Sequence, residues 1–150
     1  MSWWSESESK SAVPEIFSYP VRVQPHHTDY AGVVWHGTYV AWMEEARVEY
    51  LRSHNINFAD WVGSGVDLPV VDLSVRYRQS LALGMDAVVQ AWAEPRRGVR
   101  LVWQYDIQNQ ATGETCVLGT VTLAPVDHKT RRVLRRLPER MQGDLDRLYG

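Results

Sequence analysis

The chain has 150 residues and a formal net charge of −2 at pH 7, with 45% hydrophobic and 23% charged residues. This balance is typical of one globular domain, and it excludes a disordered chain, a collagen and a disulfide scaffold. A nearly neutral charge gives no electrostatic reason to expect binding to nucleic acid or to an anionic membrane. The single cysteine, Cys116, excludes an intramolecular disulfide and a cysteine zinc site, and the apolar runs are too short to span a membrane. We therefore expect a cytoplasmic protein.

Aromatic residues are frequent, with seven Trp, seven Tyr and two Phe. A chain of this size has little room to bury so many large rings in its own core. We therefore expect some of the rings to line a ligand site or a subunit interface.

The first half of the chain predicts a strand followed by a long helix. Residues 1–14 are rich in Ser and Glu and lack hydrophobic periodicity, so we expect a flexible tail. Alternation from Phe17 to Val23 predicts a strand, and Pro20 indicates that it lies at a sheet edge or marks a strand start. Apolar residues then recur at helical spacing between Thr38 and Ser53, which predicts an amphipathic helix.

The second half predicts four strands after a connector over residues 55–68 that holds one helical turn. The expected strands are Val71–Tyr77, Ala87–Glu94, Val99–Gln108 and Thr115–Ala124. Short hairpin connections make the last strands antiparallel. We predict an α+β fold over residues 15–126, in which one helix covers one face of a five-stranded antiparallel sheet. The other face is left to a partner or to solvent.

Residues 127–150 form a basic extension. Its arginines are Arg131, Arg132, Arg135, Arg136, Arg140 and Arg147. We expect part of it to be helical after Pro138. A solvated helix is the simpler interpretation, and binding of phosphate or of a partner is the alternative.

The residues that suggest chemistry lie just before the long helix. Asp29 and His36 flank a run of small and apolar residues at the mouth of that helix. The first helical turn has unpaired N–H groups and a partial positive charge. A carboxylate there, with a histidine nearby, would place a base or nucleophile beside an oxyanion site, as acyl transfer requires. Helix capping by Asp29 is the structural alternative.

The segment DYAGVVWHGTY…WMEEAR…EYL, within residues 29–51, resembles the signature of hotdog-fold acyl-CoA thioesterases. It is most similar to the 4-hydroxybenzoyl-CoA thioesterase family and its bacterial acyl-CoA thioester hydrolase branch. A looser resemblance extends over residues 17–125. The resemblance implies a hotdog fold, with the sheet wrapped around the helix, and hydrolysis of an acyl or aroyl thioester to free acid and coenzyme A. It also implies a homo-oligomer, a dimer or commonly a tetramer of two dimers, with each active site at a dimer interface.

Asp29 matches the family's catalytic aspartate, which attacks the thioester carbonyl or activates water to do so. The resemblance implies that backbone N–H groups near His36 and Gly37 polarise the carbonyl, and that Gly37 leaves the helix mouth open. The His36 side chain would orient water or substrate, with a purely structural hydrogen bond as the alternative.

For substrate binding, Tyr39 matches a family tyrosine on the helix, and core packing is its alternative role. Arg96 and Arg97 follow a predicted strand where the family often has basic residues, and we expect them to contact the phosphates of coenzyme A. An acyl carrier protein is an alternative donor of the acyl group, because the basic C-terminal segment would suit an acidic carrier.

Other functions are weighed against these residues. A metal held by His26, His27, Asp29 and His36 is disfavoured, because adjacent histidines on an extended segment point to opposite faces. The sequence contains no glycine-rich phosphate loop of the nucleotide-binding type, so we expect no cofactor. A hotdog hydratase or dehydratase that pairs a histidine with an acid is one alternative function. A non-catalytic acyl-CoA-binding protein is another.

Overall fold

The computed structural model describes residues 15–96 and 98–148, so the predicted tail over residues 1–14 lies outside the described residues. The elements are β1 (Phe17–Arg22), the short 3-10 helix η1 (Pro25–His27), α2 (His36–Ser53), α3 (Phe58–Gly63), β2 (Val66–Asp67), β3 (Val70–Tyr77), β4 (Asp86–Ala93), β5 (Leu101–Asn109), β6 (Thr115–Leu123), β7 (Val126–Asp127) and α4 (Glu139–Leu148).

Five strands form one antiparallel sheet in the order β1-β4-β5-β6-β3, and β2 pairs with β7 separately. The predicted α+β fold with a five-stranded antiparallel sheet and one long helix is confirmed. Pro20 lies in β1, which is an edge strand, where a residue without an N–H group is tolerated. Strands β4 to β6 alternate buried and half-buried residues, as expected when only one face carries the core.

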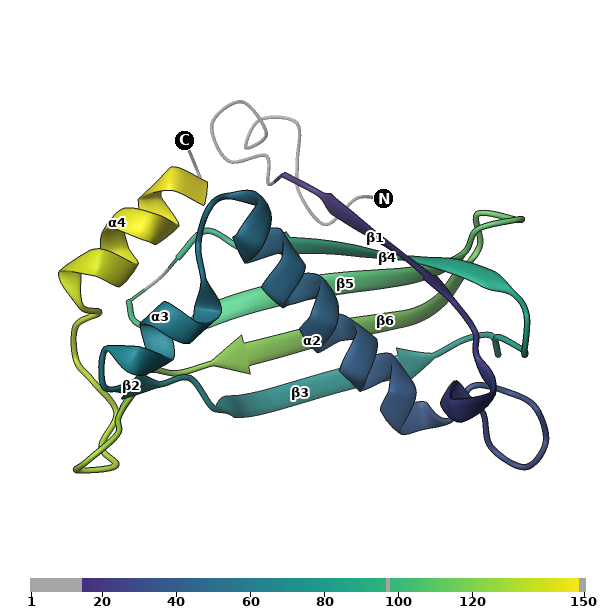
Figure 1. Ribbon diagram of the computed structural model, residues 1–150, viewed down its shortest axis with the longest axis horizontal. Coiled ribbons are helices and arrows are strands. Elements are labelled where there is room, and N and C mark those ends of the chain that lie inside the picture. Colours follow the sequence, from purple (N-terminus) through teal and green to yellow (C-terminus); the bar gives the residue numbers. More distant parts are fainter. Residues whose placement is uncertain (1–14, 97, 149–150) are drawn as a thin grey trace.

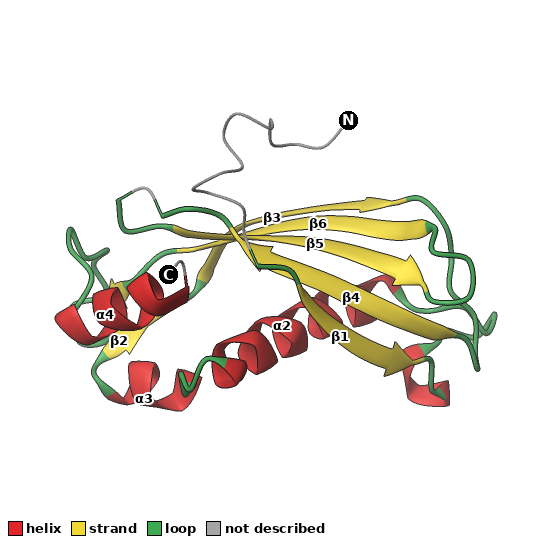
Figure 2. Ribbon diagram, turned by 90° about the horizontal axis from the view of Figure 1, so that it is seen from above, coloured by secondary structure: helices red, strands yellow, loops and turns green. Residues whose placement is uncertain are grey.

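Helix α2 lies diagonally across one face of this sheet (Figures 1 and 2). It begins at His36, two residues before the predicted start. The extended backbone of Trp35 ends the preceding loop, and its carbonyl oxygen accepts the Thr38 N–H at 2.9 Å. The buried residues of α2 recur at helical spacing, as the sequence pattern predicted.

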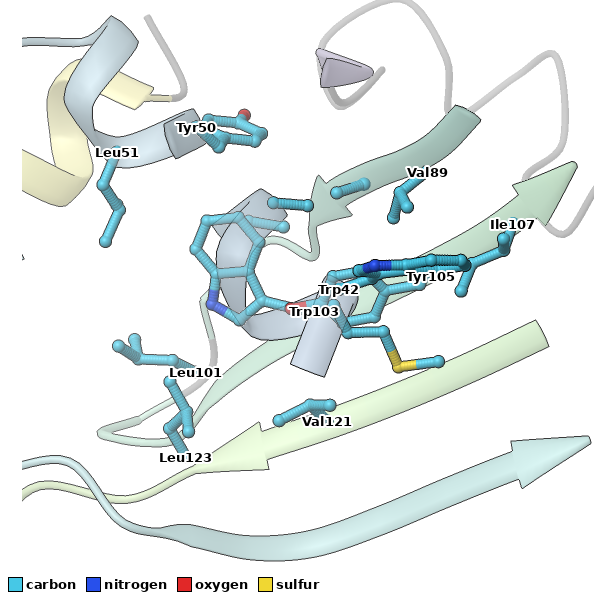
Figure 3. Close-up of a cluster of buried hydrophobic side chains, with 14 of the residues drawn as sticks. Trp42, Tyr50, Leu51, Val89, Leu101, Trp103, Tyr105, Ile107, Val121 and Leu123 are labelled. Atoms are coloured by element: carbon cyan, nitrogen blue, oxygen red, sulfur yellow. The ribbon is translucent and has the colours of Figure 1, made fainter. Parts of the chain in front are cut away.

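Large rings fill the space between α2 and the sheet (Figure 3). Tyr50 of α2 meets Trp103 of β5 edge-on, with the ring centroids 5.0 Å apart. Met43 takes up space that a side chain at position 119 would need, because a Cβ on Gly119 would lie 2.4 Å from the Met43 Cε. The interior of a single chain is therefore closely packed.

Strand β3 is the other edge of the sheet, and much of it is exposed. Leu73 pairs with Val121 of the core and so points to the α2 face, yet its side chain is 44% exposed. Val70, Val71 and Tyr77 are exposed as well. An apolar edge strand of this kind has unpaired N–H and C=O groups beside exposed apolar side chains.

Helix α4 packs against the end of the core next to α3 (Figure 1). Met141, Leu145 and Leu148 are buried, and the Trp61 indole N–H donates to the Asp144 carboxylate at 2.7 Å. The interpretation of this segment as a solvated helix is therefore wrong, because its apolar side completes the core. No helix in the described part of the chain is long and apolar enough to span a bilayer.

The packing of α4 predicts a stability change. Leu145→Ala should lower the free energy of unfolding by about 2–5 kcal/mol, because it leaves a cavity beside the core. The matched control is Val133→Ala, because Val133 is 54% exposed. This substitution should change the free energy of unfolding by less than about 0.5 kcal/mol. Urea unfolding followed by circular dichroism measures both values, and equal stability of the two variants would contradict the docking of α4.

Candidate active site

A tight hairpin joins Asp29 to the start of α2. Thr28 and Val34 form an antiparallel bridge, and the Asp29 N–H donates to the Val33 carbonyl at 2.9 Å. Gly32 turns the chain with φ of +78°, a conformation that strongly favours glycine. The hairpin is held to the fold by the Val34 N–H, which donates to Leu81 at 2.8 Å. Asp29 is therefore fixed a few residues before the helix.

The Asp29 carboxylate is half-buried and only partly engaged. Its Oδ1 accepts the Ala31 N–H at 2.8 Å, while no hydrogen bond to its second oxygen is recorded from the described residues. The N-cap of α2 is Trp35, and no side chain makes a capping hydrogen bond there. The capping alternative for Asp29 is therefore wrong, and one carboxylate oxygen remains available for chemistry.

The turn that precedes Asp29 is tied to the same helix start. The His27 carbonyl accepts the Trp35 N–H at 2.9 Å and the Thr38 hydroxyl at 3.0 Å. The His27 ring packs edge-on against Trp42, and its Nδ1 accepts the Gln24 N–H at 2.9 Å. Burial, together with the neighbouring His26, lowers the pKa of His27. His27 is accordingly a neutral part of the scaffold near pH 7.

Two backbone donors are left at the start of α2. The N–H groups of Trp35 and Thr38 have the acceptors described above, whereas the described residues supply none for those of His36 and Gly37. These are the first two residues of an 18-residue helix, where the helix dipole adds a partial positive charge. Such N–H groups can hold an anion, and their use as an oxyanion site stays a prediction.

The side chains at the helix start are aromatic and exposed. The His36 ring lies against the Trp35 indole, with centroids 4.8 Å apart, and the hydrogen bonds recorded for the described chain do not include its nitrogens. The Tyr77 hydroxyl from β3 donates to the His36 carbonyl at 3.4 Å, and Tyr77 is 51% exposed. Sequence reasoning did not place Tyr77 beside the start of α2, although the alternation of β3 puts this residue on the helix-facing side.

Tyr39 lies in the core rather than at the surface of the site. Its hydroxyl accepts the Leu81 N–H at 3.2 Å, and its ring packs between Trp42 and Tyr77. Burial raises the pKa of the Tyr39 phenol. The structure therefore places Tyr39 in the core, the alternative to substrate binding that the sequence left open.

The structure does not bring Arg96 to Asp29 within one chain. Arg22 pairs with Asp86 at the Asp29 end of the sheet, so Arg96, which follows the far end of β4, lies at the opposite end. Its guanidinium lies 3.6 Å from the Asp146 carboxylate of α4. Arg97 lies outside the described residues.

A cavity of about 690 Å³ lies elsewhere, on the sheet face away from α2. Its lining includes polar side chains that alternate with the buried residues of β4 and β5, among them Gln90, Gln104 and Asp106. None of the residues of the Asp29 hairpin lines it. The candidate site at the helix start is therefore separate from this cavity. Within residues 15–96 and 98–148, no three His, Cys, Asp or Glu side chains cluster as metal ligands would.

The sequence matches a known family and several curated proteins. Residues 31–116 match the family model described as the thioesterase superfamily. The sll0410 protein of Synechocystis sp. is 48% identical over 143 residues, which cover 95% of this chain and 86% of that protein. The acyl-CoA thioester hydrolase YbgC of Escherichia coli is 35% identical over 94 residues, which cover 63% of this chain and 70% of that protein.

Solved structures agree with the fold. The DHNA-CoA thioesterase of Staphylococcus aureus superposes with a TM-score of 0.79 at 29% identity, over 89% of this chain and 88% of that chain. A 1,4-dihydroxy-2-naphthoyl-CoA thioesterase from Synechocystis gives a TM-score of 0.80 at 20% identity, over 88% of this chain and 96% of that chain, and shows the fold alone. The chain belongs to the thioesterase superfamily, and it is a hotdog-fold thioester hydrolase.

Proposed function

We propose that the chain is an acyl-CoA thioesterase whose catalytic carboxylate is Asp29. The assignment rests on one observation. A short hairpin and helix start hold a carboxylate oxygen and two N–H groups for which the described residues provide no hydrogen-bond partner. The relatives named as acyl-CoA and DHNA-CoA thioesterases support coenzyme A as the carrier of the acyl or aroyl group.

The chemistry follows from these groups. The thioester carbonyl oxygen accepts the N–H groups of His36 and Gly37, which stabilise the negative charge that develops on it. Asp29 either attacks the carbonyl carbon or takes a proton from a water molecule that attacks it. In the first case the C–S bond breaks, an acyl-enzyme anhydride forms, and water then hydrolyses it. Both routes consume one water and release a carboxylic acid and the thiol of coenzyme A.

Two alternatives within the fold are less well supported. A hydratase or dehydratase needs Asp29 and His36 to act as a pair. The His36 ring instead lies tilted against Trp35, and within the described residues it makes no hydrogen bond to Asp29. The carrier-protein alternative rests on the basic C-terminal segment, in which Arg140 pairs with Asp60 and Arg147 with Asp144. Coenzyme A is the preferred donor because the similar proteins are named for coenzyme A thioesters.

We further propose a homo-oligomer in which a second copy pairs with the free edge of β3. An exposed apolar edge strand marks a pairing surface. Tyr77 belongs to this strand and also contacts the start of α2, so such an interface would lie beside the proposed active site. A tetramer would need a second contact surface as well.

We also propose that the protein is cytoplasmic. The buried free thiol of Cys116 is consistent with a reducing compartment.

The catalytic role of Asp29 is tested by Asp29→Asn. The amide oxygen can still accept the Ala31 N–H, so the fold should be retained, whereas kcat/KM on the best acyl-CoA should fall by about a hundredfold or more. Asp60→Asn, at an exposed carboxylate on α3, serves as the control and should keep wild-type activity. Near-wild-type turnover by Asp29→Asn would refute the assignment.

The β3 interface is tested by Leu73→Lys. Two like charges facing each other across paired edges should shift the protein toward the mass of a single chain in light scattering after gel filtration. Val133→Lys, at a similarly exposed position, should leave the assembly unchanged. A Leu73→Lys variant that has native circular dichroism and an unchanged mass would rule out this edge as the interface.

The role of Arg96 is tested by Arg96→Gln. If its guanidinium holds a phosphate of coenzyme A bound by a neighbouring copy, KM for acyl-CoA should rise severalfold at constant kcat. The corresponding N-acetylcysteamine thioester, which lacks the phosphates, should show no change. Asp146→Asn frees Arg96 from its ion pair and should not raise KM. An equal change on both thioesters would instead indicate a structural role.

A further inference from the structure

The Trp35 ring, rather than the backbone conformation, leaves no room for a side chain at position 37. A Cβ at this position would lie 2.1 Å from Cζ3 of Trp35, 2.5 Å from Cη2 and 2.7 Å from Cε3. Gly37 is not among the residues with positive φ, so its helical backbone conformation would suit any residue. The benzo ring of Trp35 therefore occupies the space of a side chain at the second helical residue. The expectation that Gly37 leaves the helix mouth open is wrong at this point.

The Trp35 side chain is exposed at the start of α2. The residue is 52% exposed and its ring lies against His36 and Gly37, for whose N–H groups the described residues provide no acceptor. Trp35 is the N-cap residue of α2, but its side chain makes no capping hydrogen bond, so the ring has no capping role. Exposed aromatic faces next to backbone donors offer an apolar wall beside a polar anchor, the combination found in small-molecule sites.

We propose that Trp35 determines which acyl groups the enzyme accepts, by restricting the space at their α-carbon. This inference rests on the proposed function. A carbonyl oxygen held by the Gly37 N–H brings the attached α-carbon close to the ring that covers Gly37. The wall leaves room for an acyl group that is unbranched or flat at this carbon. A branch at the α-carbon meets the indole and displaces the carbonyl from the donors.

The experiment compares a linear acyl-CoA with its isomer that is methyl-branched at the α-carbon, butyryl-CoA with isobutyryl-CoA or the same pair at the best chain length. Wild type should prefer the linear isomer in kcat/KM by about tenfold, since a misplaced methyl group typically changes selectivity by that order. Trp35→Ala should bring the ratio close to one, and Trp35→Phe should keep most of the preference. Val133→Ala is the control and should keep the wild-type ratio. A ratio that is near one in wild type, or unchanged in Trp35→Ala, overturns the proposal.

A double-mutant cycle tests the contact itself. Gly37→Ala should push the indole aside and change the linear-to-branched ratio, but in the Trp35→Ala background the added methyl group meets no ring and should have little further effect. Equal effects of Gly37→Ala in both backgrounds overturn the proposed role of the contact. These outcomes concern selectivity only. The assignment of Asp29 fails on a different result, the survival of turnover in Asp29→Asn.

Discussion

One helix has to cover the apolar face of a five-stranded sheet, and the rest of the structure depends on how α2 does so. Large rings are needed to fill the gap, and small residues are needed where the helix comes close, as at Gly119 beneath Met43. The contact also includes a buried cation. The Arg47 guanidinium donates to the Tyr105 hydroxyl at 3.1 Å, and burial raises the pKa of Tyr105 to about 12, so the phenol remains neutral and accepts. The position of α2 along the sheet is thus set by both packing and a polar tie.

The fixed position of α2 also holds the groups of the proposed site in place. Backbone N–H groups at a helix start are weak donors unless their position is held relative to the group that reacts. Here the His27 carbonyl bonds to both Trp35 and Thr38, and the Asp29 hairpin is bonded to Leu81. The carboxylate and the donors therefore belong to one rigid unit that rests on the same core. The half-exposed rings of Trp35 and Tyr77 then border the donors.

The sequence predicted what depends on periodicity and local motif. Apolar patterning identified the five strands of the sheet, and helical spacing identified α2 within two residues of its start. The motif around Asp29 marked the segment before α2, but it did not predict the hairpin there. What it missed depends on contacts between distant segments. The burial of α4 follows from Leu145 and Met141 meeting the far end of the core, and the separation of Arg96 from Asp29 follows from the direction of β4. The reason for Gly37 was likewise hidden, because it depends on the rotamer of Trp35 rather than on the glycine itself.

The high aromatic content can now be divided by its physical role. Trp42, Trp61 and Trp103 are almost fully buried and stabilise the chain, whereas Trp35 and Tyr77 remain half-exposed at the helix start. Tyr77 lies on the free edge strand and also contacts His36. If two copies pair through β3, this ring becomes part of the interface and of the border of the site. Assembly and acyl recognition would then depend on the same surface, so a change that weakens pairing at β3 would also alter the space beside the proposed oxyanion donors.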